Sequence, residues 1–77
     1  MQVKVVLFGI LRERFAREKH GHLTVELGEG NTIADLCTHL GFNNQVIFSV
    51  NGEVERDFER ELNDGDEVHF FQSIGGG

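Results

Sequence analysis

The sequence predicts one α+β domain, with a mixed sheet of four to five strands and two helices packed on one face of it. Its 77 residues are too few for two domains. Apolar residues alternate in the predicted strands and recur at helical spacing between them. The elements follow one another as strand, helix, strand, helix, hairpin and strand, an order in which the helices can cover one face of a sheet.

The first strand is predicted at Gln2 to Phe8, a run rich in valine. Alternation divides this run into core residues Val3, Val5 and Leu7 and outward residues Gln2, Lys4, Val6 and Phe8. A helix is predicted at Ile10 to Arg17, because Leu11 and Phe15 lie four residues apart on one side. Gly21 is expected to close this segment as a helix C-terminus.

The second strand is predicted at His22 to Leu27, where every second residue is apolar. Asn31 or Thr32 can cap the helix that follows. This helix has one apolar face, and Gly41 ends it. The residues of that face are Ile33, Leu36, Cys37 and Leu40.

The last part of the chain predicts a hairpin and a final strand. Val46 to Val50 reads as a strand, and Asn51-Gly52 is a strong signal for a hairpin turn. The charged run Glu53 to Asp57 suits the edge of a sheet. The final strand is Glu67 to Gln72, with inward and outward residues alternating. Val68 and Phe70 are expected to face inward, and His69 and Phe71 outward.

The segment after the final strand ends in three glycines. We expect residues 1–72 to form the folded domain and residues 73–77 to form a flexible tail. Glycine has no Cβ, so such a tail can enter a narrow active site. The reactive group would be the carboxylate of Gly77, which ATP can convert into an adenylate and so into an acyl donor. The alternative explanation of the three glycines is a flexible chain end without a function, or a sequence added by a cloning vector.

A tail of this kind needs a docking surface on the folded domain. Ordering each tail residue opposes binding by about 1–2 kcal/mol, so contacts of the domain must offset that cost. Alternation predicts an outward apolar face made of Phe8, Ile47 and Phe71, and we expect it to bind the partner. A shift of one residue in register would instead bury one of these side chains. The tail residues expected to contact the partner are Ser73, Ile74, Gly75 and Gly76.

Composition excludes several other functions. The net charge of -6 disfavours binding to nucleic acid. A cluster of basic residues is interrupted by glutamates and reads as a solvated helix face. It consists of Arg12, Arg14, Arg17 and Lys19. No apolar run is long enough to span a membrane, and a single cysteine without a leader pattern indicates a cytoplasmic protein.

No set of residues within the chain reads as an active site. Cys37 lies on an apolar helix face and is expected to be a buried, structural thiol. His20 and His22 lack the partners of a metal site, so we expect solvated side chains and no metal. His69 on the outer strand face is either an ordinary surface residue or one that adjusts docking with pH. The chain is therefore expected to act as a protein cosubstrate, or as a non-catalytic small subunit, and not as an enzyme.

Four segments carry a resemblance to a known family. Val5 to Glu13 resembles the first strand and first helix of the molybdopterin synthase small subunit (MoaD). Leu62 to Val68 is similar to the turn and last strand shared by that subunit and the thiamine sulfur carrier (ThiS). Val50 to Glu53 matches their hairpin, and Gly76 and Gly77 match their terminal diglycine. Over essentially its whole length the chain resembles these ubiquitin-like sulfur carriers.

The resemblance implies a ubiquitin-like β-grasp fold and a cycle of sulfur transfer. An adenylating enzyme of the ubiquitin-activating type would use ATP on Gly77, and a persulfide donor would convert it to a thiocarboxylate. No cofactor would be bound to the chain itself. In molybdopterin biosynthesis the sulfur would pass to the large synthase subunit, and in other pathways to another sulfur-accepting enzyme.

The pathway stays open at this point. The helix predicted at Ile10 to Arg17 favours the molybdopterin type, whereas the segment Phe71 to Ile74, without proline, is more similar to the thiamine carrier. Gly75 stands where these carriers often have alanine or another small residue. A modifier conjugated to lysines and a non-covalent β-grasp interaction module are the alternatives to a carrier.

Overall fold

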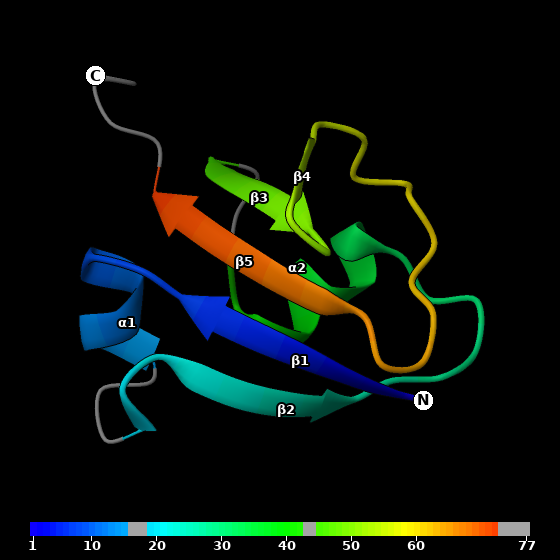
Figure 1. Ribbon diagram of the computed structural model, residues 1–77, viewed down its shortest axis with the longest axis horizontal. Helices are drawn as coiled ribbons and strands as arrows, with labels where there is room; N and C mark the ends of the chain where they lie inside the picture. Colours follow the sequence, from blue (N-terminus) through cyan, green and yellow to red (C-terminus); the bar gives the residue numbers. More distant parts are fainter. Residues whose placement is uncertain (16–18, 43–44, 73–77) are drawn as a thin grey trace.

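The computed structural model of the protein describes residues 1–15, 19–42 and 45–72. Figure 1 shows a twisted sheet with α2 lying behind it and α1 beside one end of β1. The elements are β1 (Gln2–Leu7), α1 (Ile10–Phe15), β2 (His22–Glu26), α2 (Ile33–Leu40), β3 (Val46–Val50), β4 (Glu53–Glu55) and β5 (Glu67–Gln72).

The five strands form one mixed sheet in the order β2-β1-β5-β3-β4. β1 pairs antiparallel with β2 and parallel with β5, so the first and last strands lie side by side at the centre (Figure 1). β3 pairs antiparallel with both β5 and β4. This topology confirms the predicted α+β class and the ubiquitin-like β-grasp fold.

One face of the sheet and one face of α2 form the core. The inward residues of β1 and β5 are almost completely buried, as their alternation predicted. The sheet as a whole contributes Val3, Val5, Leu7, Val25, Phe48, Val50, Val68 and Phe70 to the core. α2 contributes Ile33, Leu36 and Cys37, and α1 contributes Leu11. Both helices therefore bury side chains on the same side of the sheet.

α2 is fixed at both ends by local hydrogen bonds. Thr32, not Asn31, is the N-cap: its hydroxyl accepts from the N–H of Asp35, while the Asp35 carboxylate accepts from the N–H of Thr32 at 2.8 Å. This reciprocal pair is a capping box. At the other end Gly41 has φ +84° and ends the helix, as predicted.

Gly21 stands immediately before β2. The described part of α1 ends at Phe15, so the closing of that helical segment by Gly21 stays a prediction. The N–H of Leu7 donates to the Gly21 carbonyl at 2.8 Å. A Cβ built on Gly21 would lie 2.4 Å from the Leu7 carbonyl oxygen, and its φ is +85°. Close approach to β1 explains the glycine. Residues 16 and 17 of the predicted helix lie outside the described residues.

Three predicted strands are shorter in the structure. The first ends at Leu7 instead of Phe8. The second ends at Glu26 instead of Leu27. β4 ends at Glu55 instead of Asp57, because the Glu55 carboxylate accepts hydrogen bonds from the N–H groups of Arg56 and Asp57. These bonds lower the pKa of Glu55, with the N–H of Asp57 the larger cause.

Candidate functional site

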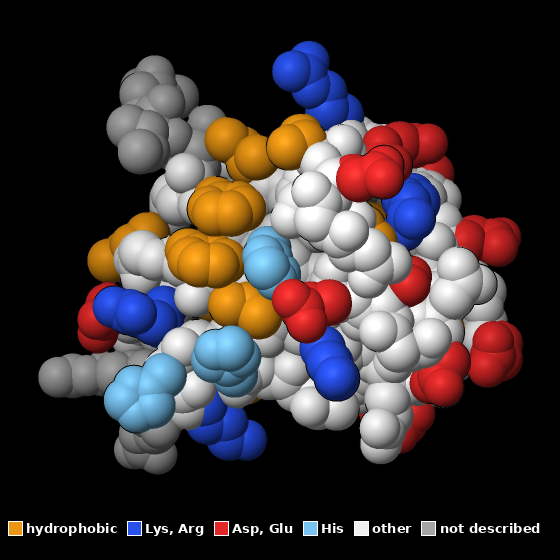
Figure 2. All heavy atoms as spheres, in the orientation of Figure 1, with side chains coloured by type: hydrophobic (Ala, Val, Ile, Leu, Met, Phe, Trp, Pro, Cys, Tyr) orange, Lys and Arg blue, Asp and Glu red, His pale blue; other side chains and the backbone are white. Residues whose placement is uncertain are grey.

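The outer face of the sheet, turned away from α2, carries an exposed apolar cluster. Phe8 is 39% exposed, Ile47 is 47% exposed and Phe71 is 38% exposed. Hydrophobic side chains gather over this part of the surface in Figure 2. The prediction that all three residues point outward is confirmed, and the alternative of a shifted register is excluded for them. We call Phe8, Ile47 and Phe71 the apolar patch.

Strand pairing brings the three patch residues together from three separate segments. In the parallel pair of β1 and β5, Leu7 lies opposite Phe70, which sets Phe8 beside Phe71. Their rings stack with centroids 4.7 Å apart and planes 9° from parallel. In the antiparallel pair of β3 and β5, Ile47 lies directly opposite Phe71. The central strand pairing therefore builds the patch, and a rigid sheet supports it.

Polar groups border the patch along β5. The His69 ring lies 5.5 Å from the Phe8 ring, and its Nε2 is 2.6 Å from a carboxylate oxygen of Glu67. His69 thus lies on the outer face, as predicted, and is paired with a carboxylate there. An apolar centre with a polar border is typical of protein–protein interfaces.

Val54 is a further outward residue that the sequence analysis missed. It is 74% exposed and lies opposite Ser49 in the β3–β4 hairpin. Ser49 is two residues from Ile47 along β3, so both side chains point to the same face of the sheet. Val54, opposite Ser49, therefore shares the outer face with the patch. The Asn51-Gly52 turn signal could have revealed this, since a two-residue turn fixes the register of the hairpin.

β5 leads from the core directly toward the glycine tail. Phe70 is fully buried, while Phe71 and Gln72 at the end of the strand are exposed. The predicted partner contacts of the tail and the carboxylate of Gly77 lie outside the described residues, so these remain predictions. They concern Ser73, Ile74, Gly75, Gly76 and Gly77.

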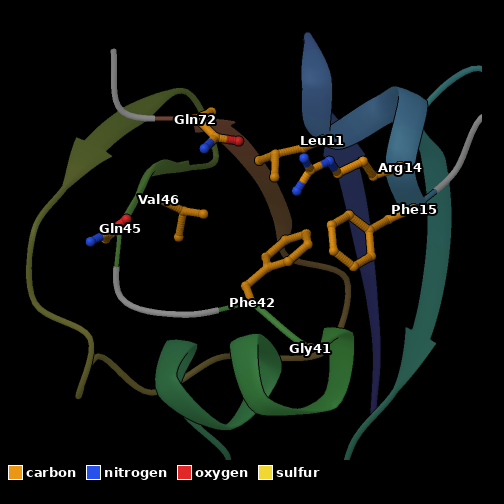
Figure 3. Close-up of a pocket in the computed structure, with 8 residues that line it drawn as sticks. All are labelled: Leu11, Arg14, Phe15, Gly41, Phe42, Gln45, Val46 and Gln72. Carbon is orange, nitrogen blue, oxygen red and sulfur yellow. The ribbon is translucent and has the colours of Figure 1, made fainter. Parts of the chain in front are cut away.

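A hollow of about 150 Å³ lies beside the end of β5, between α1 and the residues after α2 (Figure 3). Phe15 and Phe42 meet there edge to face at 4.8 Å. Phe42 in turn packs against Phe70 in the core. The hollow is lined by Leu11, Arg14, Phe15, Gly41, Phe42, Gln45, Val46 and Gln72. These contacts hold α1 against the end of the sheet from which the tail continues.

The other candidate sites are structural or solvated in the described residues. Cys37 is 5% exposed, and burial raises the pKa of its thiol to about 11, so the thiol is protonated at neutral pH. This confirms it as a structural residue. His20 and His22 are exposed. Residues 1–15, 19–42 and 45–72 contain no group of three or more metal-ligating side chains. Within the same ranges, no helix has the length and apolarity needed to cross a membrane.

Comparison with known proteins places this geometry in a family. Residues 5–77 match the model of the ThiS family. A putative molybdopterin converting factor subunit 1 from Pyrococcus furiosus is 26% identical, with a TM-score of 0.79 over 96% of this chain and 99% of its own. SAMP1 from Haloferax volcanii is 18% identical, with a TM-score of 0.76 and full coverage of both chains.

A further similar structure is a complex of subunits 1 and 2 of the molybdopterin-converting factor from Helicobacter pylori. It is 19% identical, with a TM-score of 0.67 and 100% coverage of both chains. At these identities the last two likenesses concern the fold. No curated protein matches the chain. The family match covers nearly the whole sequence, and the fold agrees with it, so the chain belongs to the ThiS family of ubiquitin-like β-grasp sulfur carriers.

Proposed function

We propose that the protein carries sulfur on the carboxylate of Gly77 and delivers it to an enzyme of molybdopterin biosynthesis. The match of residues 5–77 to the ThiS family carries this proposal, because it takes in the glycine tail as well as the folded domain. The apolar patch next to β5 supports it: a carrier must hold its domain on the partner while the tail enters the active site.

The proposed chemistry takes place in partner enzymes. The Gly77 carboxylate attacks the α-phosphate of ATP, and pyrophosphate leaves to give an acyl adenylate. The terminal sulfur of a persulfide then attacks the carbonyl carbon, and AMP leaves. A thiol cleaves the resulting acyl disulfide, so that the thiocarboxylate stays on Gly77 and a new disulfide forms on the donor side. The buried Cys37 takes no part in these steps.

Two observations favour delivery of the sulfur to molybdopterin biosynthesis over delivery to a thiazole pathway. The short helix α1 follows β1, where the molybdopterin type is expected to have a helix. The Pyrococcus furiosus protein described as molybdopterin converting factor subunit 1 is 26% identical over almost the whole chain. By likeness to the Helicobacter pylori complex, the sulfur-accepting partner would be a subunit 2.

Intact mass tests the proposed function. The protein is incubated with ATP, an adenylating enzyme of the ubiquitin-activating type, and a cysteine desulfurase with cysteine as the sulfur source. We expect the peptide that ends in Gly77 to gain the mass of one oxygen-to-sulfur exchange. A variant without Gly76 and Gly77 should gain nothing. The same spectrum shows whether Gly77 carries a free carboxylate, which the proposal requires.

Other outcomes would replace the proposal. Ladders of higher mass with Gly-Gly attached to lysine would make the protein a modifier. An unchanged mass, together with normal association with its partners, would make it a non-covalent interaction module. Sulfur loading with transfer to a thiazole precursor, and none to a molybdopterin precursor, would retain the carrier and reject the pathway.

A further inference from the structure

The outer face contains a second feature beside the apolar patch, a hollow of about 390 Å³ between β1 and β2. Its lining includes the charged groups of Lys4, Lys19 and Glu67 and the imidazole of His22. Lys4 lies on β1 between Thr24 of β2 and Glu67 of β5, since both residues are its partners in the sheet. We call this hollow the lysine hollow.

The two lysines are distinctive in this chain. Lys4 and Lys19 are its only lysines, and both line the same hollow although the net charge is -6. Neither takes part in an ion pair among the described residues. Glu67 could have paired with Lys4, but its carboxylate contacts Nε2 of His69 at 2.6 Å. The ammonium groups of the two lysines can therefore bind an acidic group of another molecule.

The lysine hollow is continuous with the apolar patch. Val6 lines the hollow and lies opposite His22 in β2. It is two residues before Phe8, which follows β1 and points to the same face of the sheet. In Figure 2, His side chains and several Lys or Arg side chains lie beside and below the hydrophobic cluster, whereas most Asp and Glu side chains lie on the right of the view. A partner seated on the patch therefore reaches the lysines with its adjoining surface.

We propose that the lysine hollow binds a carboxylate-bearing segment of the protein that docks on the apolar patch, and so fixes the orientation of the carrier. The inference rests on the proposed function, because the partner is the enzyme that receives the tail. Complementary charge around an apolar centre sets orientation and the rate of encounter more than the final affinity. Phosphate-rich ligands fit less well, since the net charge of -6 repels a polyanion.

Zero-length crosslinking tests the inference directly. A water-soluble carbodiimide joins an amine only to a carboxylate with which it is in contact, and the two lysines make every side-chain product assignable. The purified carrier is mixed with its adenylating enzyme, and the crosslinked peptides are mapped by mass spectrometry. We expect isopeptide bonds from Lys4 or Lys19 to Asp or Glu of the enzyme. Lys4→Arg/Lys19→Arg should retain binding and lose these crosslinks.

Kinetics of adenylation give a second readout. Lys4→Glu/Lys19→Glu should raise the KM for the carrier about tenfold in ATP–pyrophosphate exchange, with kcat unchanged. The difference should shrink in high salt, which screens exposed charges. Arg56→Glu serves as the control for Lys4→Glu, because Arg56 is exposed beyond β4 and the change in net charge is the same. Arg56→Glu should leave the KM unaltered.

The outcomes separate the two proposals. Both proposals are supported if the wild type is loaded with sulfur, if its lysines form the crosslinks, and if Lys4→Glu/Lys19→Glu raises the KM as expected. Loading without these crosslinks, and with equal KM for Lys4→Glu and Arg56→Glu, overturns the role of the lysine hollow and leaves the carrier function intact. Absence of loading in the wild type overturns the carrier function, and the inference that depends on it. Equal inhibition of exchange by inorganic phosphate in wild type and Lys4→Glu/Lys19→Glu would exclude a phosphate site in the hollow and support the carboxylate assignment.

Discussion

Truncation of the stacked rings Phe8 and Phe71 should weaken partner binding far more than it weakens the fold. Each ring is a little under two-fifths exposed. An aromatic side chain can bury roughly 200 Å², so about 80 Å² of each is left for a partner to cover. At ~25 cal/mol per Å², covering one ring contributes about 2 kcal/mol. Phe8→Ala or Phe71→Ala should thus raise Kd roughly 30-fold.

The double variant tests whether the two rings act as a unit. Because they stack at 4.7 Å, their effects are coupled and should add incompletely. We expect Phe8→Ala/Phe71→Ala to raise Kd by about 100-fold or more, and Phe8→Asp/Phe71→Asp to abolish measurable binding. Loss of the stack itself should lower the free energy of unfolding by about 0.5–1.5 kcal/mol. Such a loss leaves a typical domain folded.

Titration calorimetry against the adenylating enzyme, and separately against a molybdopterin synthase large subunit, measures these affinities. Phe15→Ala is a matched control, since Phe15 is 42% exposed but belongs to the hollow between α1 and Phe42. It should lower stability by a similar amount and leave Kd unchanged. A Kd for Phe8→Ala/Phe71→Ala within threefold of the wild-type value, in a protein that is still folded, would refute the assignment of the patch.

Three further predictions concern the framework that presents the patch. Gly21→Ala should lower the free energy of unfolding by about 2–4 kcal/mol, because it adds a clash with a backbone oxygen at 2.4 Å to the strain of φ +85°. Gly65→Ala, with the same φ and open space, should cost only about 1 kcal/mol; equal losses in urea would contradict the close-approach explanation. Thr32→Ala should cost about 1 kcal/mol by removing the capping box of α2, and an unchanged urea midpoint would contradict it. Burial raises the pKa of Cys37 from 9.0 to about 11. The contribution of this thiol to the free energy of unfolding is therefore complete below pH 9 and is lost as the pH rises toward 11. Relative to Cys37→Ala, the wild type should therefore lose about 1 kcal/mol per pH unit in that window, and parallel pH profiles would contradict this.

Local periodicity was sufficient to predict the strands and the direction of their side chains. In β1 and β5 every second residue is apolar, and a period of two assigns each side chain to one face without any knowledge of the partner strand. The outward positions of Phe8 and Phe71 followed from this rule alone. The capping box at Thr32 and the glycine at position 41 likewise depend on neighbouring residues.

Features made by distant segments could not be predicted in the same way. The parallel pairing of β1 with β5 joins residues more than sixty positions apart, and the stack of Phe8 on Phe71 is a consequence of that register. The close approach of Gly21 to β1 could not be predicted, because the carbonyl that excludes a side chain at this position belongs to a different element. The lysine hollow depends on three strands at once, so neither Lys4 nor Lys19 carried a signal of it in the sequence.

The account depends most on the reactivity of the last carboxylate of the tail. The decisive comparison uses two semisynthetic proteins that are identical except at Gly77, one with a free acid and one with a carboxamide. Both retain the apolar patch and should bind the adenylating enzyme with equal affinity. With ATP and a persulfide donor, we predict that the free acid acquires one sulfur and that the carboxamide acquires none. Equal sulfur loading of the two proteins would contradict the account.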